Sequence, residues 1–420
     1  MKNTAFDAIP RSAQGHFRLN YYAAVYCLLH QIQCLGRVKG DDTEEAFEAY
    51  PFLARYLEEI LPFLPQDLGW DEGFAWWEEQ LTHWEQEAAR LPLTALKQEC
   101  GLGFHSRMAL MLSGLIEEDS RFGTLFAELQ SPLSYRRPGL ELVGRLAAGL
   151  GDQDGWRICR PLLSAGLLEA ANSEAPRSEW ILRVPPLIWD ALRGESGDRP
   201  ASGYSLYHPE EFSQLSQLIF PPDFHTRLQQ LPALLRGGKA RSLVLRGTPG
   251  NEPLQLMGAV ARTLGRGVAV VELENSTQEA ANHYKSLGAF CTLTGALPVF
   301  SCQPGPGETV TIPPSGNLLR PPLPNCQLPT ANCQLDPKLQ ASGSRLQVPE
   351  NPDLGAWTSD FGPSLLPGYS GPIGILLGLE GGLDGPGTEQ ALALTLPITA
   401  TIHPCDRVRS PWLSIRQQDS

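Results

Sequence analysis

The chain has 420 residues, enough for two or three domains that each bury a hydrophobic core. Its formal net charge of −13 disfavours sequence-independent binding to nucleic acid, because such binding requires cations that neutralise phosphates. The nine cysteines are scattered and form no C-x-x-C pair, so we expect free thiols and no metal site.

Residues 1–100 predict a helical N-terminal region. The first residues contain no apolar core of a signal peptide, and no run in the chain approaches the roughly 18 apolar residues that span a membrane. We therefore expect a cytoplasmic protein without a membrane partner. Phe17–Gly36 predicts a buried helix, and Asp71–Leu91 predicts an amphipathic helix whose aromatic stripe packs on a neighbour. The stripe consists of Phe74, Trp77, Leu81 and Trp84.

Residues 101–192 predict a winged-helix-like module, in which short helices precede a pair of strands. Phe104–Gln130 predicts two helices with a break near Asp119, and Arg137–Leu150 and Trp156–Asn172 predict two more. Winged helices bind DNA through a recognition helix or serve as protein docking modules. Because the segment ELVGRLAAGL carries a single arginine, we expect no DNA binding from it.

A Gly-, Ser- and Pro-rich linker is predicted at 193–203, followed by an α/β domain at 204–402. Helix and strand patterns alternate there, which is typical of a parallel sheet. A Pro/Gly-rich insertion at 303–369 contains the repeated tetrapeptide NCQL, and residues 403–420 form an irregular tail. The expected strands are Ser242–Gly247, Val268–Leu273, Ala296–Cys302, Pro372–Leu379 and Leu392–Ile398, and the expected helices are Pro221–Gly238, Glu252–Gly265 and Ser276–Phe290.

The turn after the first of these strands has the outline of a phosphate-binding loop. The sequence RSLVLRGTPGNEPLQL runs from an apolar strand through a Gly-Pro-Gly turn into a helix. The backbone of this turn and the start of the helix could bind the phosphates of ATP, the one cofactor that the pattern suggests. A tight strand-to-helix turn without a ligand is the alternative. The candidate nucleotide-binding residues are Gly247, Thr248, Pro249, Gly250 and Asn251.

The side chains that ATP hydrolysis requires are missing. Glu252, Pro253 and Leu254 stand where the phosphate-loop motif has its final Gly, its Lys and its Mg²⁺-binding Ser/Thr. Proline has no N–H to offer a phosphate, and Glu252 adds a negative charge beside it. The third strand runs into Ser301–Gln303, where an ATPase has an acidic pair. We therefore expect no catalytic residue and no metal ligand, and any residual enzyme activity would be that of an ATPase.

The order of these regions resembles bacterial AAA+ ATPases with an N-terminal variant winged-helix domain, a group that includes ATPases associated with contractile injection systems. A D-x-R-[FY] element matches at Asp119–Phe122, and an R-R-P-[ST] element matches at Arg136–Pro138 with Gly139 as a departure. The resemblance extends over about 102–398. It implies a P-loop fold with a degenerate Walker A loop, and the chain corresponds to the N-terminal region plus a degenerate first ATPase module.

The resemblance and the missing residues together predict a catalytically inactive AAA+-related protein, a pseudoenzyme that acts as a structural or regulatory subunit. Its expected partner is an AAA+ ATPase relative or a second copy of itself. Two alternatives stay open. The chain could belong to an ATPase complex whose hydrolysis is supplied by a partner module, or it could be a winged-helix DNA-binding regulator.

Overall fold

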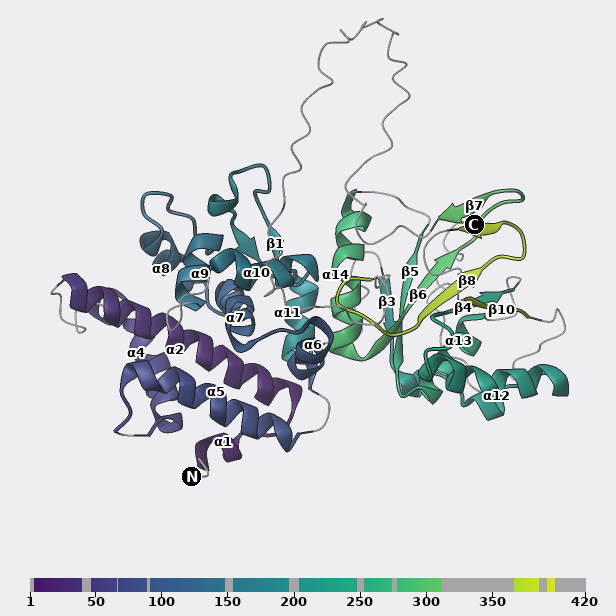
Figure 1. The fold of residues 1–420 in the computed structure, drawn as a ribbon, viewed down its shortest axis with the longest axis horizontal. Coiled ribbons are helices and arrows are strands. Elements are labelled where there is room, and N and C mark those ends of the chain that lie inside the picture. Colours follow the sequence, from purple (N-terminus) through teal and green to yellow (C-terminus); the bar gives the residue numbers. More distant parts are fainter. Residues whose placement is uncertain are drawn as a thin grey trace, which may run out of the picture.

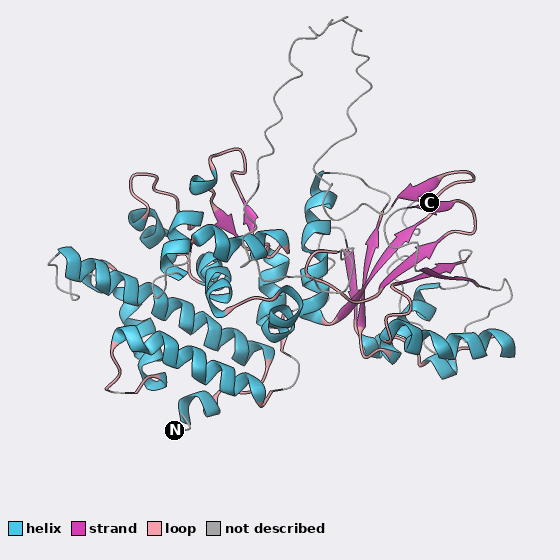
Figure 2. Ribbon diagram, viewed as in Figure 1, coloured by secondary structure: helices cyan, strands magenta, loops and turns pink. Residues whose placement is uncertain are grey.

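The computed structural model describes most of the chain, with gaps. The described residues are 4–39, 47–65, 67–88, 91–147, 154–195, 204–247, 253–273, 278–311, 366–384 and 391–396. Most of these residues are helical, and Figure 2 shows the helices of the first half on one side and a twisted sheet on the other. The described residues up to 195 are therefore mainly helical, and those from 204 onward include the sheet. Residues 196–203 of the predicted linker lie outside the described residues.

Helix α2 (Ala13–Lys39) runs along the middle of the helical part and contacts α4, α5 and α7 (Figure 1). Every residue from Leu19 to His30 is buried, which confirms the predicted buried helix. In α5, the predicted stripe packs inward, since Trp77 and Leu81 are 0 % exposed. The surrounding elements are α1 (Thr4–Ala8), α4 (Pro51–Ile60), η1 (Leu61–Phe63), α5 (Trp70–Gln86), α6 (Pro92–Cys100) and α7 (Phe104–Glu118).

The second group of helices ends in a small hairpin. The predicted break near Asp119 is confirmed, because α7 ends at Glu118 and α8 begins at Phe122. Helices α9 and α10 cross so closely that a Cβ added to Gly144 would lie 2.4 Å from the Cα of Gly155. The elements are α8 (Phe122–Leu129), α9 (Leu140–Ala147), α10 (Gly155–Ser164), β1 (Glu169–Ala170), η2 (Arg177–Glu179), β2 (Leu182–Arg183) and α11 (Pro186–Arg193).

The sheet of the second half has six strands in the order β10-β4-β8-β6-β5-β3. Five of them are parallel, but β3 pairs antiparallel with β5, so the sheet is mixed and the predicted all-parallel sheet is wrong at this edge. The linker pattern and the short YSLY sequence gave no sign of β3. The strands are β3 (Tyr204–Tyr207), β4 (Ser242–Arg246), β5 (Gly267–Glu272), β6 (Ala296–Cys302), β8 (Ile373–Leu377) and β10 (Ala391–Thr395).

Helices cover both faces of this sheet. Helices α12 (Pro222–Arg236) and α13 (Pro253–Thr263) share one hydrophobic core with Leu376 of β8 and with the short η4 (Leu215–Gln217). The turn η3 (Pro209–Glu211) contacts α13 but contributes no buried side chain. The alternate residue Ile375 faces the other core, which contains α14 (Gln278–Thr294). Because both faces are buried, the strands are apolar throughout, which is why they could be predicted as continuous apolar runs.

Helix α14 joins the sheet to the helical part (Figure 1). It packs on β6 on one side and on α6 and α11 on the other. The approach is close at Gly166, whose φ of 70° favours glycine and where a Cβ would lie 2.2 Å from the carbonyl oxygen of Lys285. The buried residues of α14 and of α2 therefore belong to one continuous hydrophobic core.

Candidate functional site

Gly247, the described residue of the predicted nucleotide site, lies at the carboxyl edge of the sheet. Strand β8 is inserted between β4 and β6, so the chain leaving β4 runs towards β5 while the chain leaving β8 runs towards β10. In open α/β sheets, ligands bind at such a reversal, outside the carboxyl ends of the strands. Gly247 follows β4 at this point, whereas Thr248, Pro249, Gly250 and Asn251 lie outside the described residues.

The backbone at Gly247 is already bonded within the protein. Its N–H donates to the carbonyl oxygen of Leu377 at 3.2 Å, so this donor is not directed at a ligand. Helix α13 begins at Pro253, which has no N–H, and Leu254 packs partly buried against the core beneath the helix. The two positions that would carry the Lys and the Mg²⁺ ligand therefore contribute to the start and the packing of a helix.

The end of β6, where an ATPase has its acidic pair, supplies no carboxylate among the described residues, whereas the adjacent strand β5 ends in Glu272. Ser301 pairs with Glu272 of β5 in the ladder, and the thiol of Cys302 donates to the carbonyl oxygen of Leu376 at 3.6 Å. Burial raises the pKa of the Cys302 thiol to about 11, so it stays protonated at neutral pH. A protonated thiol and a hydroxyl at the end of β6 cannot replace an acidic pair as metal ligands or as a base.

A small second sheet covers this edge. Strands β7 (Thr309–Thr311) and β9 (Gly382–Asp384) pair in parallel beyond the ends of β6 and β8, as Figure 1 shows for β7. The guanidinium of Arg246, at the end of β4, donates to the carbonyl oxygen of Gly381 at 3.0 Å. Glu308 accepts from the backbone N–H of Gly305 at 2.9 Å and so closes its own turn. The sequence predicted an irregular Pro/Gly-rich insertion at 303–369, which includes β7, and gave no sign of this covering sheet.

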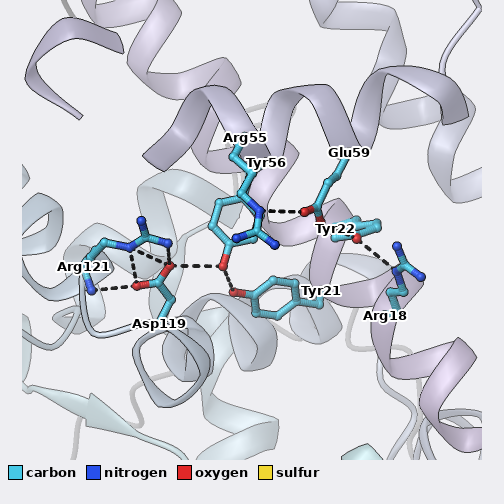
Figure 3. A network of polar contacts seen from close by, with 8 residues as sticks. All are labelled: Arg18, Tyr21, Tyr22, Arg55, Tyr56, Glu59, Asp119 and Arg121. Atoms are coloured by element: carbon cyan, nitrogen blue, oxygen red, sulfur yellow. Dashed lines mark hydrogen bonds and ion pairs between the residues drawn. The ribbon is translucent and has the colours of Figure 1, made fainter. Parts of the chain in front are cut away.

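A second candidate lies in the helical part, between α2, α4 and the turn that joins α7 to α8. It is a cavity of about 590 Å³, and we call it the tyrosine–arginine pocket. Figure 3 shows its polar side chains, which converge from these three segments. Three tyrosines and three arginines define the pocket: Arg18, Tyr21, Tyr22, Arg55, Tyr56 and Arg121.

One chain of hydrogen bonds in this pocket starts at Asp119. The carboxylate accepts from Arg121 at 2.6 Å and from the hydroxyl of Tyr56 at 3.3 Å (Figure 3). Tyr56 in turn shares a hydrogen bond of 3.1 Å with Tyr21. The hydrogen bonds from Arg121 hold the pKa of Asp119 below its usual range, and burial raises the pKa of both tyrosines. Asp119 is therefore ionised and both phenols are protonated at neutral pH.

A second chain runs along the other side of the pocket. Arg18 donates through Nε to the hydroxyl of Tyr22 at 3.0 Å, and that hydroxyl donates to Glu59 at 2.7 Å. Glu59 also accepts from Arg55 at 3.1 Å. Sequence analysis missed this pocket, because its residues come from segments that are far apart in the chain. The local signs were the spacing of Arg18 and Tyr22, and of Arg55 and Glu59, by one helical turn, and the motif match at Asp119 and Arg121.

The two matched motif elements lie against each other in space. Arg137 forms an ion pair with Glu117 at 2.5 Å, and Arg136 donates to the carbonyl oxygen of Ser120 at 3.3 Å. The backbone N–H of Arg121 donates to Asp119 at 3.0 Å, which fixes the turn before α8. These motif residues therefore stabilise the junction of α7, α8 and the loop that leads to α9.

A short antiparallel hairpin of β1 and β2 follows α10. Gly139 forms an isolated bridge with Ile181, beside the ladder of β1 and β2. The helix directly before the hairpin is α10, whereas the ELVGRL segment with its single arginine lies in α9. Helix α10 exposes Arg157 and Arg160, and Arg177 on the hairpin lies 4.1 Å from the ring centroid of Trp156.

No protein-family model, no curated protein and no solved structure matches this chain. In the described segments, His, Cys, Asp and Glu side chains form no group of three that could hold a metal ion. None of the described helices is long and apolar enough to cross a bilayer. The family membership and the cytoplasmic location expected from the sequence stay predictions.

Proposed function

We propose that the chain is a non-hydrolysing relative of AAA+ ATPases that acts as a structural or regulatory subunit. One observation carries this proposal: the described residues at the corner where phosphates would bind, Gly247, Pro253 and Leu254, are bonded or packed within the protein. The N–H of Gly247 is bonded to Leu377, α13 begins at Pro253, and Leu254 packs against the core. A six-stranded α/β sheet with such a corner supports a role in assembly better than a role in hydrolysis.

The first test measures ATP hydrolysis and ATP binding by the purified chain. We expect no turnover above background and no change in melting temperature with Mg²⁺–ATP, because binding to the folded state would raise that temperature. Turnover that Gly250→Asp abolishes would contradict the proposal, since this substitution places a carboxylate in the turn. The surface variant Arg157→Gln is the matched control, since it lies outside this edge of the sheet.

The second test concerns the partner, which we propose is an AAA+ ATPase relative or a second copy of this chain. Light scattering over a range of concentrations reports self-association. Turnover by a separate AAA+ ATPase, measured with and without saturating amounts of this chain, reports regulation or shared active sites. A chain that stays monomeric and leaves the turnover of such an ATPase unchanged would count against both forms of the proposal.

DNA binding is the second candidate function, and one observation favours it. Arg157 and Arg160 are exposed on α10, the helix directly before the hairpin. The net charge of −13 opposes it. A gel shift with random duplex DNA at low salt distinguishes the two functions. A shift that disappears in the Arg157→Gln/Arg160→Gln variant would support DNA binding, and no shift at low salt would exclude it.

A further inference from the structure

Strand β10 forms one end of the six-stranded sheet, and no strand in the described part of the chain pairs with its outer side (Figure 1). Its sequence, Ala-Leu-Ala-Leu-Thr, contains no charge and no proline. Its register with β4 advances residue by residue, so the strand contains no bulge. Charges, prolines and bulges are the features that keep an edge strand from pairing with another chain. Strand β10 therefore has the properties of an edge that can accept a partner strand.

The hydrogen bond just after β10 identifies the backbone groups that face outward. The N–H of Leu396 donates to the carbonyl oxygen of Arg246 on β4 at 2.7 Å. Successive residues of a strand direct their backbone groups to opposite sides, so the even-numbered residues of β10 bond to β4. The odd-numbered residues, Ala391, Ala393 and Thr395, direct their N–H and C=O groups away from β4. Each of these three residues therefore offers a donor and an acceptor at the open edge.

The sequence of β10 is nearly symmetric about Ala393, which favours a second copy of the same strand as the partner. In an antiparallel pair with a two-fold axis at Ala393, this residue lies opposite its own equivalent, and Ala391 lies opposite Thr395. All the outward groups then form about six hydrogen bonds, two for each of three opposed pairs. Leu392 lies opposite Leu394 of the other strand, on the face where both leucines pack against the core beneath α12 and α13.

We propose that the chain forms a two-fold symmetric dimer in which the β10 strands of two copies pair antiparallel about Ala393 and join their sheets into one continuous sheet. This inference rests on the proposed function, because it selects the second copy as the partner of the subunit and assigns the surface that binds it. A two-fold interface uses the same edge of both copies, so assembly through this surface stops at the dimer.

The first measurement is the mass of the full chain by light scattering over about a hundredfold range of concentration. We expect a monomer–dimer equilibrium whose Kd falls as salt is raised, because each copy has a formal charge of −13 and the paired strands have none. Hydrogen exchange supplies a local readout. Protection of 391–395 should increase with concentration, because the outward N–H groups become bonded in the dimer.

Substitutions of Ala393, whose side chain is exposed, separate the interface from the fold. Ala393→Pro removes an outward N–H but no bond to β4, and should raise the Kd about thirtyfold because the dimer loses two hydrogen bonds. Ala393→Lys places two ammonium groups opposite each other and should give a monomer. An equimolar mixture of Ala393→Lys and Ala393→Glu should dimerise again, because the axis at this residue brings the opposite charges together. Ala393→Ser, the matched control, should dimerise like the native chain.

Three results would overturn the inference: a native chain that stays monomeric, which would assign the edge to another occupant; a dimer that Ala393→Pro and Ala393→Lys leave intact; or a mixture of the Ala393→Lys and Ala393→Glu variants that stays monomeric. Circular dichroism checks that the variants are folded. If Ala393→Pro is not folded, the Lys and Glu variants test the interface without altering the backbone. Failure of this test is distinguishable from failure of the proposed function, because ATP turnover and the effect on a separate AAA+ ATPase are measured independently of mass.

Discussion

Replacing Glu85 by glutamine should strongly destabilise the helical part. The carboxylate lies among α2, α5 and α7, where one of its oxygens accepts from Arg107 at 2.5 Å and from His16 at 2.8 Å. Arg107 is 1 % exposed and His16 is 0 % exposed. In the described part of the chain, Glu85 is the one acceptor for the guanidinium of Arg107. Glu85→Gln keeps the shape of the side chain but leaves a buried, uncompensated positive charge.

Breaking a buried ion pair from one side costs about 3–5 kcal/mol, because the remaining charge has lost its solvation and its partner. We therefore expect the free energy of unfolding to fall by about this amount, measured by urea unfolding with tryptophan fluorescence. Trp84 is a local probe, since its ring stacks on His16 with 5.6 Å between centroids. The double variant Glu85→Gln/Arg107→Met removes the orphaned charge and should recover most of the loss.

Glu87→Gln is the matched control on the same helix end. This carboxylate pairs with Arg11 at 2.8 Å but its side chain is 48 % exposed, so its loss should cost less than about 1 kcal/mol. The reasoning is refuted if Glu85→Gln costs no more than Glu87→Gln. It is also refuted if the double variant loses as much free energy of unfolding as the two single variants lose together, because the two partners of one ion pair must be coupled.

Three further predictions follow from buried groups and from the junction. Burial lowers the pKa of His16 below 6.5, so as the pH falls the unfolded chain takes up a proton on this residue before the folded chain does. The free energy of unfolding should therefore fall as the pH drops below about 6.5, by up to about 1.4 kcal/mol per pH unit. Urea titrations at several pH values should show a weaker dependence of this free energy on pH for His16→Gln. Gly166→Ala should lower the melting temperature and weaken the hydrogen-exchange protection of α14, because the new Cβ would meet the carbonyl oxygen of Lys285 at 2.2 Å. Unchanged protection of α14 would contradict this prediction. Burial raises the pKa of the Cys27 and Cys159 thiols to about 12. Both thiols should therefore react slowly with a disulfide reagent at pH 8 until urea unfolds the chain. Rapid labelling of these two residues in the native protein would refute their burial.

The regular elements of the fold could be predicted because their patterns are local. The helix at Phe17–Gly36 and the strand at Ala296–Cys302 are apolar over enough residues to be recognised without a partner. Short pairings could not be recognised in this way. Strand β3 has four residues, and its place at the sheet edge depends on the hydrogen bonds it exchanges with β5. The β7–β9 pair likewise joins segments on either side of the long insertion.

The parts of the two candidate sites also differ in whether a local sequence pattern could predict them. The candidate phosphate loop could be proposed from sequence, because the motif is contiguous and Pro253 removes an N–H whatever the fold around it. The covering of the sheet edge by β7 and β9 depends on tertiary contacts and could not. In the helical part, the motif match selected Asp119 and Arg121 but gave no sign that Tyr56 of another helix bonds to the same carboxylate.

The position of α14 has a consequence for how the polypeptide could be divided. Its buried face belongs to the core of the helical part as well as to one face of the sheet. A cleavage of the chain within 196–203 would therefore cut the sequence without dividing the core. We expect the two fragments to stay together like the subunits of an obligate heterodimer, and to reassemble when they are produced separately and mixed. A fragment that begins at Tyr204 and is produced alone would expose the apolar side of α14 and aggregate.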